Sequence, residues 1–228
     1  LCTRILRENV IKMDKTKPIA ALFDLDGVIF DTETHYTRFW RELAPILQPD
    51  IPDFGSIIKG QTLIQIFEKY FKDQREAQQL ILDRLAEFES AMRYDYIPGI
   101  EMLIEVLQRN GVRMAVVTSS DQAKMTHVHR AHPELGQIFE HILTAEMFVR
   151  SKPAPDAYLL AAETCGTVPE NCIVFEDSFH GIESGRRAGM KVVGLATTNP
   201  AEAIAGLCDL VIPDFRGFTY EQMLALLD

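Results

Sequence analysis

Short runs of apolar residues alternate with amphipathic stretches along most of this 228-residue chain. The runs are only a few residues long and are bounded by polar residues or by glycine, which is typical of strands that are buried on both faces of a parallel sheet. This pattern predicts strands over 19–23, 113–118, 172–176, 191–196 and 209–212.

The amphipathic stretches between these runs predict helices over 99–111, 155–166, 178–190 and 219–228. Gly111 and Gly166 stand at the ends of two of these stretches, where a glycine commonly stops a helix. Alternation of strands and helices produces right-handed crossovers between parallel strands. The sequence therefore predicts an α/β fold, a Rossmann-like parallel sheet with helices on both faces.

Residues 33–96 interrupt the alternation, because they carry helical spacing and contain no convincing strand. An all-helical block within an α/β chain is typical of an inserted domain, and Pro98-Gly99 marks its second joint. The predicted organisation is an N-terminal lead-in over 1–18, an α/β core over 19–32 and 97–228, and a helical cap domain over 33–96.

Composition and charge restrict the possible partners. The net charge of -10 argues against nucleic acid and anionic membranes, since both require basic patches. The longest apolar runs fall short of the roughly 20 residues that span a bilayer, and the lead-in lacks a secretory apolar region. The cysteines show no CxxC spacing, which favours reduced thiols and, by default, a cytoplasmic location; they are Cys2, Cys165, Cys172 and Cys208.

Polar side chains gather where the predicted strands end, and ligands of open parallel sheets bind beyond the carboxyl ends of the strands. These side chains are Asp24, Asp26, Thr118, Ser119, Ser120, Glu176 and Asp177, and Lys152 follows in a nearby loop. Crowded carboxylates require a counter-ion, and Mg²⁺ prefers oxygen ligands of this kind. A phosphoryl group could be bound at this edge, because a divalent cation, an ammonium and hydroxyl groups there would offset its negative charge and donate hydrogen bonds to its oxygens.

The same segments resemble the four motifs of the haloacid dehalogenase superfamily in order and spacing. They are DLDGV (24–28), VVTSS (116–120), SKP (151–153) and FEDSFHGIESGRRAGM (175–190). The helical insertion after the first motif is similar to the small cap of the phosphatase and β-phosphoglucomutase branch. One motif alone is a weak signal, but agreement of four across several elements is hard to obtain by chance.

The resemblance implies a catalytic role for five of these residues. Asp24 would be the nucleophile that forms an aspartyl-phosphate. Asp26 would protonate the leaving oxygen and then take a proton from the attacking water. Thr118 and the Ser119 amide would hold the transferring oxygens, while Lys152 would balance their charge and restrain Asp24.

The resemblance also implies a magnesium site. Asp24, the main-chain carbonyl of Asp26 and the Asp177 carboxylate would bind Mg²⁺, and Glu176 would act mostly through a metal-bound water. Dehalogenases of the superfamily lack the second aspartate of the first motif. The presence of Asp26 and Asp177 therefore favours phosphoryl transfer over dehalogenation.

Hydrolysis is favoured over intramolecular transfer by two positions of the cap. β-Phosphoglucomutases resemble the chain through DGVIFDT (26–32) and KGQT (59–62), but they carry a histidine where this chain has Tyr36 and an arginine where it has Leu63. His35 lies one place early, and one residue turns a helical side chain by about 100°. The candidate substrate-binding residues of the cap region are Thr32, His35 and Lys59.

The sequence thus predicts a Mg²⁺-dependent phosphatase that acts on a small phosphorylated metabolite. A phosphosugar mutase of the β-phosphoglucomutase type, an inorganic pyrophosphatase and a non-catalytic phosphate-sensing scaffold remain alternatives. The substrate stays open, because the cap sets it in this superfamily, and so does the oligomeric state.

Overall fold

The computed structural model describes residues 16–59 and 61–228, so the predicted lead-in over 1–18 lies mostly outside the described residues. Its centre is a six-stranded sheet with the order β3-β2-β1-β4-β5-β6, in which every neighbouring pair is parallel. The strands are β1 (Ala20–Phe23), β2 (Arg113–Val117), β3 (His141–Leu143), β4 (Cys172–Glu176), β5 (Lys191–Leu195) and β6 (Leu210–Ile212). The predicted α/β class and parallel sheet are confirmed.

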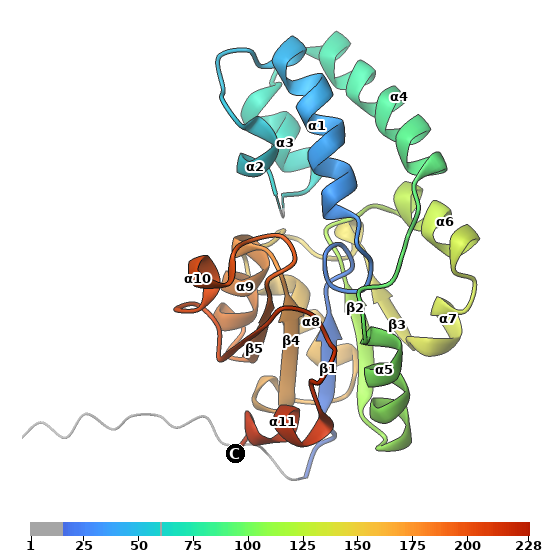
Figure 1. The fold of residues 1–228 in the computed structure, drawn as a ribbon, viewed down its shortest axis with the longest axis vertical. Coiled ribbons are helices and arrows are strands. Elements are labelled where there is room, and N and C mark those ends of the chain that lie inside the picture. Colours follow the sequence, from blue (N-terminus) through green and yellow to red (C-terminus); the bar gives the residue numbers. More distant parts are fainter. Residues whose placement is uncertain (1–15, 60) are drawn as a thin grey trace, which may run out of the picture.

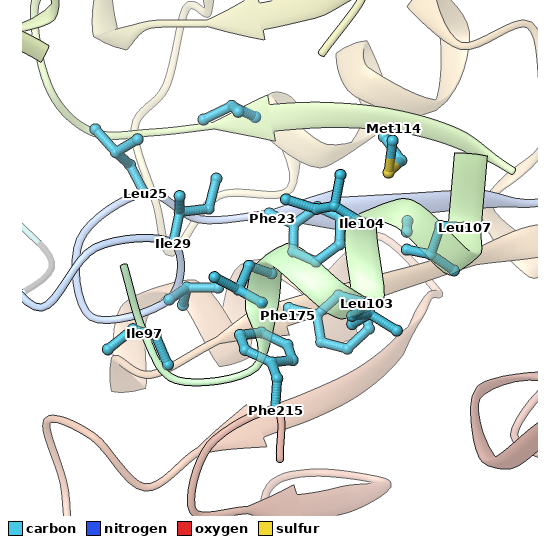
Figure 2. Packing of buried hydrophobic residues seen from close by; sticks show 14 of the residues in the cluster. Phe23, Leu25, Ile29, Ile97, Leu103, Ile104, Leu107, Met114, Phe175 and Phe215 are labelled. Carbon is cyan, nitrogen blue, oxygen red and sulfur yellow. The ribbon is translucent and has the colours of Figure 1, made fainter. Parts of the chain in front are cut away.

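Both faces of the sheet are buried. Successive side chains of a strand point to opposite sides, so each strand contributes to the hydrophobic cluster on each face. Phe23 of β1 and Phe175 of β4 lie on one face and stack with their ring centroids 4.7 Å apart (Figure 2). Leu22 and Val174, one residue earlier in each strand, pack into the cluster on the other face. This two-sided burial explains the continuous apolar runs in the sequence.

Helices cover the two faces of the sheet. One face packs against α5 (Ile100–Arg109), α6 (Gln122–Ala131), α7 (Leu135–Ile138) and α11 (Tyr220–Ala225). The other packs against α8 (Asp156–Thr164), α9 (Phe179–Arg187) and α10 (Ala201–Ile204), with short 3-10 turns at η1 (Ala145–Met147) and η2 (Pro169–Asn171). None of the described helices is both long and apolar enough to cross a membrane.

Four further helices lie beyond the carboxyl ends of the strands, at the top of Figure 1: α1 (Glu33–Leu47), α2 (Phe54–Ile57), α3 (Leu63–Tyr70) and α4 (Arg75–Ala91). They pack around their own hydrophobic cluster, whose largest members include Trp40, Phe54 and Phe71. We propose that they form the inserted cap. The two connecting segments lie side by side, since the Asp31 amide donates to the carbonyl of Asp95 at 2.9 Å.

Candidate active site

The turn after β1 carries the first two aspartates and depends on Gly27. The Gly27 amide donates to the Phe30 carbonyl at 2.7 Å, and its φ of 73° lies in the left-handed region that favours glycine. A Cβ at this position would lie 2.1 Å from Oδ2 of Asp177. Only a residue without a side chain lets this turn approach the end of β4, and the approach brings the two acidic loops together.

Lys152 forms hydrogen bonds to residues of both the first and the last motif. Its Nζ donates to Oδ1 of Asp24 at 2.7 Å, to Oε1 of Glu176 at 2.6 Å and to the Val117 carbonyl at 2.9 Å. Burial alone would lower the pKa of this lysine, but the two carboxylates together raise it. Lys152 is therefore a charged ammonium that is 1% exposed and restrains Asp24 from the loop beyond β3.

Glu176 is the last residue of β4 and Asp177 follows it, and the two complete a group of three buried carboxylates with Asp24. One carboxylate oxygen from each residue lies within 4.8 Å of the other two. Burial raises the pKa of Asp24 to about 7 against the opposing effect of Lys152, and it also raises the pKa of Asp177. When ionised, the three carboxylates outnumber the single ammonium, so their charged forms require a further cation, and their all-oxygen donor set fits a hard divalent ion such as Mg²⁺.

The orientation of Glu176 is fixed by hydrogen bonds to both of its oxygens. Oε2 accepts from the amides of Asp177 at 3.1 Å and Ser178 at 3.2 Å, while the Tyr158 hydroxyl donates to Oε1 at 2.9 Å. The main-chain carbonyl of Asp177 accepts from Asn199 Nδ2 at 2.8 Å. The carboxylates of the candidate cation site are thus held in place by surrounding hydrogen-bond donors, as is usual where ligand geometry matters.

Asp26 lies apart from that carboxylate group and faces Lys124 of α6. Lys124 Nζ lies 2.6 Å from both carboxylate oxygens, Ser120 Oγ donates to Oδ2 at 3.0 Å, and the Thr32 hydroxyl donates to Oδ1. Burial favours the neutral form, but Lys124 and the two hydroxyls hold the pKa of Asp26 below its ordinary value. Sequence reasoning assigned no role to Lys124, which lies 98 positions from Asp26.

The second motif supplies hydroxyl groups at the end of β2. The Thr118 hydroxyl is buried and accepts from the Ser120 amide at 3.0 Å. Ser119 Oγ is also buried and has no hydrogen-bond partner among the described residues. A buried polar atom without a partner is costly, so Ser119 is suited to bind an oxygen that arrives with a ligand.

Comparison with known proteins agrees with this geometry. The family model for haloacid dehalogenase-like hydrolases matches residues 21–195. The chain belongs to this family. Hexitol phosphatase A of Escherichia coli is 32% identical over 193 residues, 79% of this chain and 83% of that protein. Fructose-1-phosphate phosphatase YqaB of the same organism is 30% identical over 176 residues, 75% of this chain and 93% of that protein.

A solved structure supports the same assignment. The haloacid dehalogenase-like hydrolase of family IA, variant 3, from Entamoeba histolytica has a TM-score of 0.79 and 26% identity, covering 92% of this chain and 99% of that chain. The predicted superfamily and enzyme class are confirmed, a hydrolase of the branch that contains phosphatases and β-phosphoglucomutases.

In this haloacid dehalogenase-like hydrolase, a cavity of about 660 Å³ lies between the core and the cap and is lined by Asp24, Asp26, Thr118, Ser119, Lys152 and Asp177. Of the candidate substrate-binding residues, Lys59 lines the cavity and its Nζ donates to the Thr198 carbonyl at 3.4 Å. Thr32 is buried and its hydroxyl donates to Asp26. Neither Thr32 nor His35 is among the residues that line the cavity.

Proposed function

We propose that this chain is a Mg²⁺-dependent phosphatase that hydrolyses a small phosphate monoester through an aspartyl-phosphate. The observation that carries this proposal is the contact of Lys152 with both Asp24 and Glu176 at the edge of a cavity large enough for a metabolite. The similarity to a hexitol phosphatase and a fructose-1-phosphate phosphatase supports a phosphate monoester as the substrate.

In the first step, a carboxylate oxygen of Asp24 attacks the phosphorus and the bond from phosphorus to the alcohol oxygen breaks. Asp26 donates a proton to that oxygen, so the alcohol leaves neutral. Without substrate, the Asp26 carboxyl group is kept ionised by Lys124, which lowers its pKa. A phosphate dianion beside Asp26 favours its protonated form, because a like charge raises the pKa of a carboxyl group.

In the second step, water attacks the phosphorus of the aspartyl-phosphate and the bond to Asp24 breaks. Asp26, now ionised, accepts the proton from the water, and inorganic phosphate leaves. Thr118, Ser119 and Lys152 bind the phosphoryl oxygens in both steps. The net reaction converts a phosphate monoester and water into an alcohol and inorganic phosphate.

Asp24 and Asp177 would hold the Mg²⁺ together with the main-chain carbonyl of Asp26, and Glu176 would act mostly through a metal-bound water. When bound, the cation offsets the excess negative charge of the site and of the phosphoryl oxygens. The carboxylates can then stay ionised at neutral pH beside a dianionic substrate.

Lys124 acts in this proposal through Asp26, as a positioning residue. We expect Lys124→Met to lower kcat about 10- to 100-fold, because Asp26 loses the ammonium that holds both of its oxygens. The acidic limb of the kcat–pH profile should also move to higher pH, since the countercharge that lowers the pKa of Asp26 is gone.

Lys191→Met is the matched control, because Lys191 of β5 pairs with Asp209, which precedes β6, and takes no part in the proposed chemistry. Thermal unfolding of both variants separates lost positioning from lost folding. An unchanged kcat and pH profile in a folded Lys124→Met variant would contradict the role.

The mutase alternative is tested by its product. β-Glucose 1-phosphate with a trace of the 1,6-bisphosphate should yield free phosphate or no turnover, while acetyl phosphate is hydrolysed as a positive control. A mutase must grip the distal phosphate from the cap, and Leu63 cannot replace a guanidinium fork there. Formation of glucose 6-phosphate faster than release of phosphate would show that the chain is a mutase.

A further inference from the structure

The cavity has two chemically different ends. Its floor carries the polar groups of the four motifs, while its roof is formed by the cap. The roof is dominated by apolar side chains from α1, the end of α2, α3 and α4, among them Trp40, Ile58, Ile64, Phe67, Leu82 and Leu85. The alcohol part of a substrate whose phosphate lies on the floor would contact this roof.

Several polar side chains of the roof are already bonded within the protein. The Tyr36 hydroxyl donates to Glu89 at 2.7 Å, and Asp83 accepts from Gln79 at 2.8 Å. Thr62 is occupied by its capping box at the start of α3. Gln61 donates to the Ile57 carbonyl at 2.8 Å, and Lys59 donates to the Thr198 carbonyl at 3.4 Å. Glu33 and Thr37 also line the cavity and could meet one or two hydroxyl groups of a ligand. The remaining hydroxyl groups of a bound polyol would lose water against an apolar wall, which makes their burial unfavourable.

Two apolar side chains of the roof remain accessible. Ile64 is 66% exposed and Leu82 is 41% exposed, and both line the cavity. An apolar ligand would remove them from water, which is favourable roughly in proportion to the apolar area buried. The volume of about 660 Å³ also exceeds what a phosphoryl group alone would occupy.

We propose that the substrate is a phosphate monoester of a hydrocarbon-rich alcohol, with an alkyl or aromatic group, rather than a sugar or polyol phosphate. This inference rests on the proposed phosphatase function. The phosphorus–oxygen bond to that alcohol breaks, water supplies the new oxygen on phosphorus, and the products are the free alcohol and inorganic phosphate.

The test compares two six-carbon esters of primary alcohols, n-hexyl phosphate and sorbitol 6-phosphate, with the full chain in Mg²⁺. The matched chain length separates the effect of hydroxyl groups from that of size. We expect kcat/KM to be at least tenfold higher for n-hexyl phosphate. We also expect kcat/KM to rise about fourfold for each methylene added from n-butyl to n-hexyl phosphate.

Two variants test whether the preference for n-hexyl phosphate depends on the apolar side chains of the roof. In a double variant, Ile64→Asn with Leu82→Asn, the preference for n-hexyl over sorbitol phosphate should fall at least fivefold. Ile46→Asn is the matched control, because Ile46 is a 72% exposed residue of α1 that does not line the cavity. Its preference should equal that of the unaltered chain.

The outcomes separate the two proposals. Equal or higher kcat/KM for sorbitol 6-phosphate, or a preference that the double variant does not change, would overturn the hydrocarbon substrate and leave the phosphatase standing. Failure to release phosphate from both esters and from acetyl phosphate would overturn the phosphatase itself, and the substrate inference with it.

Discussion

Replacing Asp24 by Asn is expected to reduce phosphate release by about 10³-fold or more, because an amide is a far poorer nucleophile than a carboxylate. The variant should also form no acid-stable covalent adduct with the phosphoryl group. Asp24 lies 2.7 Å from Lys152 Nζ at the edge of the cavity, so the substitution changes one functional group and little volume.

Folding should survive this change. The amide oxygen still accepts from Lys152, and Lys152 keeps its 2.6 Å contact with Glu176. Loss of one carboxylate also relieves repulsion within the buried acidic group. Asp50→Asn is the matched control at an exposed position of the cap and should retain full activity. More than a tenth of the original rate in the Asp24→Asn variant would rule out Asp24 as the nucleophile.

The fold was largely predictable because both faces of the sheet are covered. β1, β2, β4 and β5 are buried on both sides and appear in the sequence as continuous apolar runs. β3 was not among the predicted strands. It has only three residues, His141 and Ile142 are partly exposed, and it forms the edge of the sheet, so it lacks the apolar run that marks its neighbours.

The candidate site was predictable only where a motif carries it. Asp24, Lys152 and Glu176 come from three motifs, and the structure brings their side chains into contact. Lys124 lies outside the motifs, on α6, which contains both polar and apolar residues. A single lysine on such a helix is usually a surface residue. Its near-complete burial against Asp26 and the Tyr36 ring depends on a contact between α6, the β1 turn and the cap.

Trp40 illustrates why the shape of the cap was harder to predict. Trp40 lies on the amphipathic helix α1 and packs into the cap cluster with Phe39 and Phe54. The same side chain also lines the cavity. Helical periodicity indicates which face is apolar, but not whether part of that face is turned towards the cap core or towards a ligand.

Removal of divalent cations with EDTA is expected to abolish phosphate release, and added Mg²⁺ should restore it. Without the cation, three buried carboxylates share one ammonium, and a dianionic substrate would add further negative charge. Excess Ca²⁺ should inhibit, because it takes more ligands at longer distances than Mg²⁺ and would disturb the in-line geometry. Full activity in metal-free buffer would contradict the cation's role and favour dehalogenase-type chemistry.

Binding of the cation can also be measured without substrate, through its effect on the thermal unfolding temperature. Folding raises the pKa of Asp24 from 3.8 to about 7, so the folded state retains protons that the unfolded state releases. Stability without a cation therefore falls as the pH rises between these values. Mg²⁺ at about 100 times its Kd should raise Tm by about 5–10 °C at pH 8, and by less at pH 5, where Asp24 is largely protonated. Asp177→Asn should remove most of this increase, whereas an equal increase in that variant would place the cation elsewhere.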